Sequence, residues 1–163
     1  MKRATYEFSY EVYDSIDKLT EDDKWLLAEA RKATEDAYAP YSHFSVGAAA
    51  RLSNGTSVRG SNQENASFPA GLCAERVLLA AVASLQPAAT IETLAISYNN
   101  QQGASDYPIS PCGICRQSLQ EYTQHTGKAI RLILGGMRGP VYILADANAL
   151  LPLCFTAHDL KGN

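Results

Sequence analysis

The order of the predicted elements favours an α/β or α+β sandwich, in which helices pack on a mixed β-sheet. Short stretches with alternating or continuous apolar residues are typical of strands. In the second half, stretches with apolar residues at helical spacing alternate with them. Apolar residues make up 46% of the 163 positions, which is enough for a substantial core, and the length predicts a single domain, 1–163.

The predicted first elements are a strand, a helix and a hairpin. Residues 5–13 alternate apolar and polar side chains, which predicts a half-buried strand. Thr20 is placed to cap a helix that runs to about Tyr38, with acidic residues in its first turn. Two strands, 44–52 and 57–60, flank an Asn-Gly pair that is typical of a hairpin turn.

The second half is predicted to alternate helices and strands. We expect a helix over 73–85 and a strand over 91–98. A further helix is expected to begin at Pro111, with Ser110 as its cap, and to run to about Gln124. The remaining elements are two strands and a helical turn, over 130–134, 141–144 and 146–150.

Charge and composition exclude several classes of function. The formal net charge is −3, and no Lys/Arg cluster of the kind that tracks phosphates is present, so we expect no nucleic-acid partner. No apolar run is long enough to cross a bilayer, and the first residues lack the apolar stretch of a secretory signal. We therefore expect a cytoplasmic protein with no membrane partner. In that compartment thiols are more often metal ligands or redox groups than disulfides.

Three of the four cysteines lie in two short motifs, each at the start of a predicted helix. Cys73 belongs to Cys-Ala-Glu-Arg, and Cys112 and Cys115 belong to Ser-Pro-Cys-Gly-Ile-Cys-Arg-Gln. Free N–H groups and the dipole at a helix N-terminus lower the pKa of a thiol, and the thiolate is the form that binds zinc. A Cys-x-x-Cys pair alone could also be a redox pair or two inert thiols. Together the two motifs favour one zinc site with three thiolate ligands.

The fourth zinc ligand decides between two kinds of site. If it were Cys154 the site would be closed and structural, whereas a water would make it catalytic. Glu75 stands two residues after Cys73, where a carboxylate can act as general acid/base beside a metal-bound water. Arg76 could hydrogen-bond the sulfurs and offset the negative charge of zinc with three thiolates. Both residues are also compatible with a solvated helix start, so this alternative stays open.

These motifs resemble those of the zinc-dependent cytidine deaminases of the small, homotetrameric type. The stretches 37–56, 60–68 and 150–155 resemble the family's hairpin region, ribose-binding loop and C-terminal segment, and the resemblance covers roughly 20–156. It implies an α/β fold, a three-layer sandwich with a mixed five-stranded sheet and helices on both faces. Residues 1–14 go beyond this core as an N-terminal extension that adds an extra strand.

The resemblance implies a role for each residue of the two motifs. Cys73, Cys112 and Cys115 would hold one Zn²⁺ per subunit, with water as the fourth ligand. Glu75 would take a proton from that water, pass it to N3 of cytosine, and later protonate the departing ammonia. Arg76 would hydrogen-bond the sulfurs that bind the metal.

The resemblance also implies a pocket for a nucleoside. Asn62 and Glu64 would hydrogen-bond a ribose hydroxyl, and Phe44 would pack against the base. The backbone of Ala74 and the carbonyl of Ser110 would contact the polar edge of the pyrimidine.

The same resemblance implies an oligomeric state and identifies residues at the rim of the nucleoside pocket. Phe155 would stack on the base in the site of a neighbouring subunit, within a homotetramer that shares its active sites. Cys154 is predicted to be a small buried residue and not a ligand. Two departures from the family pattern, Gln63 and 68–72, lie at the expected rim.

The function that the resemblance implies is hydrolytic deamination of cytidine and deoxycytidine to uridine and deoxyuridine, with release of ammonia, in pyrimidine salvage. One alternative is a deaminase for another aminopyrimidine nucleoside, such as a blasticidin-type compound. A second alternative is a non-catalytic structural zinc module. The acidic balance and the lack of basic or aromatic platforms argue against a deaminase that edits nucleic acid.

Overall fold

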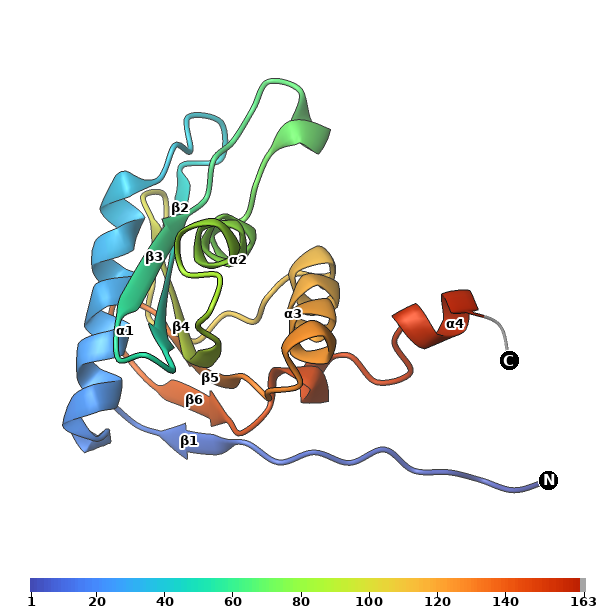
Figure 1. Ribbon diagram of the computed structural model, residues 1–163. Coiled ribbons are helices and arrows are strands. Elements are labelled where there is room, and N and C mark those ends of the chain that lie inside the picture. Colours follow the sequence, from blue (N-terminus) through green and yellow to red (C-terminus); the bar gives the residue numbers. More distant parts are fainter. Residues whose placement is uncertain (162–163) are drawn as a thin grey trace.

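Apolar strand-forming stretches assemble into one six-stranded sheet with the order β1-β6-β5-β4-β2-β3 in the computed structural model, which describes residues 1–161 (Figure 1). The five predicted core strands are all present, and β1 is the predicted extra strand at the sheet edge. Residues 162–163 of the predicted domain lie outside the described residues. The strands are β1 (Glu11–Tyr13), β2 (Phe44–Leu52), β3 (Ser57–Ser61), β4 (Ile91–Asn100), β5 (Arg131–Gly135) and β6 (Val141–Leu144).

The sheet is mixed, as predicted, and four of its strands, β1, β3, β4 and β5, share one direction. β4 and β5 are parallel, whereas β2 is antiparallel to both β3 and β4. It follows that β3 and β4 also run in the same direction, so their carboxyl ends lie at the same edge of the sheet. The helix that follows each of these two strands therefore begins at this edge.

Helices cover both faces of the sheet, which gives the predicted three layers (Figure 1). Because side chains of a strand alternate between faces, Ala95 and Ile133 pack toward α1, and their neighbours Leu94 and Leu132 pack toward α2 and α3. None of the helices in the described chain has the length and apolar character needed to span a bilayer. The helices are α1 (Glu21–Ala33), α2 (Ala74–Leu85), α3 (Gly113–Thr126) and α4 (Ala157–Lys161), with short 3-10 turns η1 (Ile16–Lys18), η2 (Thr34–Asp36), η3 (Phe68–Ala70) and η4 (Ala147–Leu150).

The first helix starts where it was predicted to start and ends earlier. The Thr20 hydroxyl accepts a hydrogen bond from the third helical N–H at 3.2 Å, which confirms it as the cap. The helix ends at Ala33 and not near Tyr38. Its last turn tightens into η2, where the Thr34 hydroxyl donates to the Arg31 carbonyl at 2.7 Å and satisfies a group that the ending helix leaves free.

The third helix begins two residues later than predicted. Cys112, and not Ser110, occupies the cap position, and the first helical residue is Gly113. Pro111 lies outside the helix, and its carbonyl accepts a hydrogen bond from Nε of Arg116 at 2.8 Å. This side-chain bond holds the proline in the preceding segment. The shift brings the Cys112 thiol to the helix N-terminus itself.

The prediction of a half-buried strand over 5–13 was wrong for most of its length. Only Glu11–Tyr13 pairs with a neighbour, and the residues before it are exposed. The partner strand β6 has just four residues, so it cannot pair with a longer segment. The predicted alternation survives as a row of rings from Tyr6, Phe8 and Tyr10, whose neighbouring centroids lie 6.4 and 6.2 Å apart.

Gly60 of β3 allows α2 to lie directly against the sheet. A Cβ atom at this position would lie 2.6 Å from the Ala74 carbonyl oxygen and 2.7 Å from the Leu78 nitrogen. Both are backbone atoms of α2, so any larger residue would push the helix away. Gly60 thus fixes how close the start of α2 lies to the sheet.

A partly buried ion pair ties α1 to β5. The Arg131 guanidinium donates two hydrogen bonds to the Asp23 carboxylate, at 2.6 and 2.8 Å. Burial opposes ionisation of Asp23, but the hydrogen bonds and charge of Arg131 outweigh it and lower the pKa of the carboxyl below its ordinary 3.8.

We expect Asp23→Asn to lower the free energy of unfolding by about 2 kcal/mol at neutral pH, because a charged hydrogen-bonded pair is lost. The pKa of Asp23 is lower in the folded than in the unfolded chain. The contribution of the pair is therefore complete above the ordinary pKa of 3.8 and is lost as pH falls through the folded value. Urea unfolding of both proteins across the acid range tests this. A difference in stability that does not shrink in acid would contradict it.

Candidate active site and zinc centre

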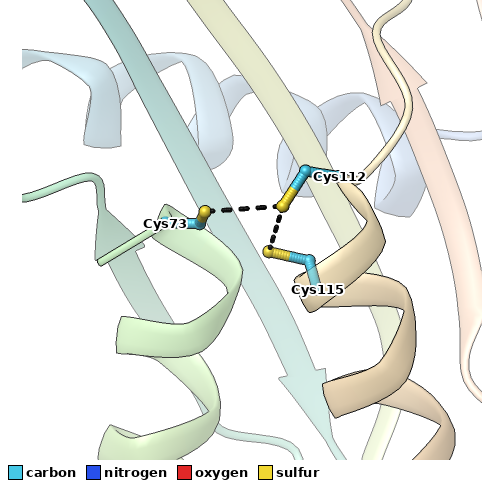
Figure 2. A group of neighbouring side chains, drawn as sticks. All are labelled: Cys73, Cys112 and Cys115. Carbon is cyan, nitrogen blue, oxygen red and sulfur yellow. Dashed lines mark hydrogen bonds between the residues drawn. The ribbon is translucent and has the colours of Figure 1, made fainter. Parts of the chain in front are cut away.

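Three thiols from two helices meet in one cluster (Figure 2). The Sγ atoms of Cys73 and Cys112 lie 3.7 Å apart, and those of Cys112 and Cys115 lie 3.5 Å apart. All three lie within 4.8 Å of one another. A tetrahedral zinc ion with Zn–S bonds of about 2.3 Å holds its sulfurs about 3.8 Å apart. The spacing and the donor type therefore fit zinc.

Helix starts place these thiols. Cys73 is the cap residue of α2 and Cys112 is the cap residue of α3, while Cys115 lies in the first turn of α3. Both helices follow strands whose carboxyl ends share one sheet edge, so their N-termini come together. The positive ends of two helix dipoles then point at the cluster, which favours thiolates.

Proton sharing within the cluster separates the pKa values of its thiols. Hydrogen bonding with Cys115, followed by bonding with Cys112 and the charge of Arg76, lowers the pKa of Cys73 to about 6 against the effect of burial. Hydrogen bonding to Cys73, burial and the charge of Glu75 raise the pKa of Cys115. Without a cation, adjacent thiols cannot all ionise. A divalent ion supplies the missing positive charge, so the electrostatics also fit zinc.

The fourth cysteine does not join the cluster. Within residues 1–161 the group with metal-binding geometry contains Cys73, Cys112 and Cys115 alone. Cys154 is half-buried, so the prediction of a small buried residue was wrong. The described chain thus brings three protein ligands together, and a closed site made of four thiols does not form.

Glu75 is buried at the start of α2, beside the thiols. The exposed fraction of this residue is 4%. This excludes the alternative interpretation of Glu75 as a solvated residue at a helix start. Burial, together with the charge of Cys73, raises the pKa of its carboxyl. Arg76 acts on the Cys73 thiol through its charge. Within the described chain, no hydrogen bond links its guanidinium to a sulfur, and that bond stays a prediction.

A cleft with a volume of about 490 Å³ opens over the cluster. Of the residues that the sequence singled out, it is lined by Phe44, Asn62, Glu64, Cys73, Glu75, Arg76, Ser110 and Cys112. The two departures at the rim also line it, as Gln63, Phe68, Pro69, Gly71 and Leu72. Sequence reasoning missed the apolar lining residues Val46, Ile109 and Ile114. Ile109 and Ile114 are next in sequence to predicted site residues, and Val46 lies on the same strand face as Phe44. This proximity is the signal that could have identified the three residues.

A buried tyrosine supports the ring of Phe44. The two rings of Phe44 and Tyr98 stack with centroids 5.0 Å apart and an interplanar angle of 14°. Tyr98 is fully buried and contacts Tyr107 edge-on at 5.8 Å. Sequence reasoning missed Tyr98, which holds Phe44 in a fixed orientation at the cleft wall.

Asn62 and Glu64 are both anchored to the backbone near the cleft. The amide oxygen of Asn62 accepts from the Val46 N–H at 2.7 Å, and its nitrogen donates to the Phe44 carbonyl at 3.0 Å. One carboxylate oxygen of Glu64 accepts from the Tyr41 N–H at 2.9 Å. Hydrogen bonding by Ser42, followed by that of backbone N–H groups, lowers the pKa of Glu64. The Tyr41 and Ser42 N–H groups both donate to the same carboxylate oxygen of Glu64, so these two backbone bonds leave its other oxygen free.

Gln63 fixes the loop between these two residues. Its side-chain amide donates to the Asp36 carbonyl at 3.3 Å and to the Ser61 hydroxyl at 3.1 Å. Its backbone exchanges two hydrogen bonds with Leu72, at 2.8 and 2.9 Å. The departure from the family pattern thus closes the loop that forms the rim.

Besides the buried Cys115, two predicted residues do not line the cleft, namely Ala74 and Phe155. Ala74 is buried as the first residue of α2, where only its backbone could face a ligand. Phe155 is exposed outside the cleft, and its carbonyl accepts a hydrogen bond from Gln117 at 2.8 Å. A role for Phe155 in the site of another subunit stays a prediction.

Comparison with known proteins agrees with this site. A family model described as the cytidine and deoxycytidylate deaminase zinc-binding region matches residues 20–129. The chain is 36% identical to a cytidine deaminase from Halalkalibacterium halodurans over 140 residues, which cover 86% of this chain and 98% of the relative. It is 35% identical to a cytidine deaminase from Sporosarcina psychrophila, over 83% of this chain and 93% of that relative.

Solved structures give the same result. The crystal structure of cytidine deaminase from Burkholderia pseudomallei matches with a TM-score of 0.69 and 34% identity, over 84% of this chain and 100% of that one. A cytidine deaminase from Mycobacterium tuberculosis matches with a TM-score of 0.64 and 31% identity, over 84% of this chain and 99% of that one. Fold, thiol cluster and sequence agree, and the chain belongs to the zinc-binding cytidine and deoxycytidylate deaminase family.

Proposed function

We propose that this protein hydrolyses cytidine and deoxycytidine to the corresponding uridines and ammonia. The observation that carries the proposal is the buried Glu75 carboxyl beside three thiols at the floor of a nucleoside-sized cleft. The similarity to cytidine deaminases over most of the chain supports the substrate class. We also propose that 1–163 acts as a single catalytic domain.

The chemistry assigned to this chain's own residues is proton transfer. A zinc ion bound by Cys73, Cys112 and Cys115 supplies a Lewis acid that activates water at neutral pH. Glu75 accepts a proton as water attacks C4 of the pyrimidine and delivers it to N3. Glu75 then carries the remaining proton of that water to the departing amino group, which leaves as ammonia. The apolar surroundings that raise the pKa of Glu75 suit a group that must both accept and return a proton.

Binding of the nucleoside is assigned to the residues around the cleft. The free carboxylate oxygen of Glu64 and the Asn62 amide would bind the ribose. The ring of Phe44, backed by Tyr98, would pack on the base, and the Ser110 carbonyl would accept a hydrogen bond from the pyrimidine edge. The anchoring of these groups to backbone supports the proposal, since pre-positioned groups lose little entropy on binding.

We infer further that the enzyme is a homotetramer with shared active sites, in which Phe155 stacks on the base in a neighbouring site. The C-terminal segment supports this because it exposes three large apolar side chains, those of Leu153, Phe155 and Leu160. A cytoplasmic location would suit the site, since a reducing compartment keeps its thiols free.

Removal of single thiols tests the ligand set. We expect Cys73→Ala to lose most of its zinc and its activity, because one of three protein ligands is gone. Cys154→Ala is the matched control and is expected to keep one zinc per chain and full turnover. Zinc content by mass spectrometry and cytidine turnover are measured on both. Loss of zinc from the Cys154 variant would instead favour a structural site.

Removal of the proton carrier tests the chemistry. We expect Glu75→Gln to bind zinc normally and to lower kcat about 100-fold or more, as is typical when a general acid/base is lost. The loss of absorbance on mixing with cytidine gives the rate. Glu121→Gln makes the same chemical change at an exposed position of α3 and should be fully active. Near-normal kcat in a zinc-loaded Glu75 variant would contradict the assignment.

Substitution of the anchored carboxylate tests the ribose contact. Glu64→Gln keeps an oxygen for the Tyr41 N–H but loses the charge, so kcat/KM for cytidine should fall about tenfold. Free cytosine has no ribose, so its turnover should change little. Steady-state kinetics with both substrates measure the ratio. Equal losses with cytidine and cytosine would show that Glu64 only supports the fold.

A further inference from the structure

The N-terminal arm, residues 6–10, runs in extended form from β1 past the sheet edge toward η4 (Figure 1). It lies before the region that the family model matches, which begins at residue 20. The relative from Halalkalibacterium halodurans is covered over 98% of its length while 86% of this chain is used, so this chain carries residues beyond the shared core. Nothing in the proposed chemistry uses the arm.

The arm is docked along the core through its rings. The Tyr6 hydroxyl donates a hydrogen bond to the Ala149 carbonyl in η4 at 2.9 Å. From Tyr6 the rings of Phe8 and Tyr10 continue in a row that ends on Tyr142 of β6, whose centroid is 5.0 Å from that of Tyr10. The exposed fractions of Phe8 and Tyr10 are 49% and 48%, so half of each residue is covered.

The covered side of these rings lines an open pocket of about 190 Å³ against the core. Ser110 lines this cavity on one side and the catalytic cleft on the other. The cavity is smaller than the roughly 300 Å³ or more of pockets that hold drug-sized ligands, so we do not interpret it as a second nucleoside site. It is an apolar space directly behind a residue of the proposed nucleoside pocket, and Phe8 and Tyr10 form its outer wall.

A set of hydrogen bonds also links the arm to the segment 110–112, which includes Ser110. The Tyr6 hydroxyl holds the Ala149 carbonyl, and the next carbonyl, that of Leu150, accepts from Nη1 of Arg116 at 3.0 Å. The Nε of Arg116 donates to the Pro111 carbonyl at 2.8 Å. Pro111 lies between the residue that lines both cavities and a zinc-ligand cysteine. The arm therefore reaches the 110–112 segment by packing and by hydrogen bonds.

We propose that the N-terminal arm positions the 110–112 segment, and that Phe8 and Tyr10 are positioning residues for the nucleoside pocket. The inference rests on the proposed function, which assigns the Ser110 carbonyl to the pyrimidine edge. Removal of the rings takes away one wall of this pocket and the apolar backing of Ser110. A misplacement of about 1 Å at a contact with substrate can cost up to about 100-fold in rate.

The double variant Phe8→Ala/Tyr10→Ala tests the proposal in the full chain. We expect it to keep its zinc and its oligomeric state, while KM for cytidine rises about tenfold, within the cost of a small misplacement. Hydrogen exchange of the peptide 109–116 should become faster, and that of α1 should not. Trp25→Ala removes an aromatic side chain with an exposed fraction of 50% from α1 and should change neither quantity. The single variant Tyr10→Phe keeps the ring, so its KM and its exchange rate at 109–116 should equal those of the wild type.

Each outcome decides the proposal. An unchanged KM or an unchanged exchange rate at 109–116 in the double variant overturns it, whatever the effect on thermal stability. If the double variant does not fold, Tyr6→Phe decides, because it removes only the hydrogen bond to Ala149 and should speed exchange at 109–116 to a smaller extent. If the wild type does not turn over cytidine, the proposed function fails, and the exchange measurement alone then decides whether the arm holds the segment.

Discussion

Two helix N-termini have to meet at one edge of the sheet, and the rest of the site depends on this constraint. β3 and β4 run in the same direction, so α2 and α3 begin at the same edge and bring Cys73 and Cys112 together. Gly60 lets α2 come close enough to the sheet for this to happen. Three thiols within 4.8 Å of one another cannot all ionise without a cation. The topology therefore creates a binding site for a metal before any contact with substrate is considered.

The floor and the rim of the cleft are built in different ways. Helix starts supply the thiols and Glu75, and groups on regular elements are positioned more precisely than groups on loops. The rim is an irregular loop, which Gln63 closes by pairing with Leu72 and by reaching the Asp36 carbonyl. The proton chemistry thus depends on the rigid floor. We expect preference among nucleosides to depend on this loop, whose shape is set by a few hydrogen bonds and where the chain departs from its family pattern.

Sequence patterns predicted the fold correctly where local preference and tertiary context agree. The strand 44–52 and the following turn are examples, and Gly55 in that turn adopts a φ of +81°, which glycine alone tolerates well. Pro111 is a counterexample. Its local preference is for the first position of a helix, but the bond from Arg116 to its carbonyl holds it outside. For 5–13 the alternation predicted a half-buried strand, but the partner strand is too short to pair beyond Glu11–Tyr13, and the alternation survives only as a row of rings.

Some residues of the site could be predicted from the sequence, and others could not. A Cys-x-x-Cys pair alone left a redox pair or inert thiols open, and the third thiol at the start of a second helix carried the prediction of zinc. The apolar lining was not predictable, because Val46 and Ile114 in a cleft have the same sequence signature as residues in a core, and only the folded chain separates them. The arm extends this argument. The alternation around Phe8 predicted a half-buried strand, but the sequence could not say that its rings line a pocket that Ser110 also lines. In our proposal, a segment outside the shared family core therefore acts on the nucleoside pocket without contributing a residue to the cleft.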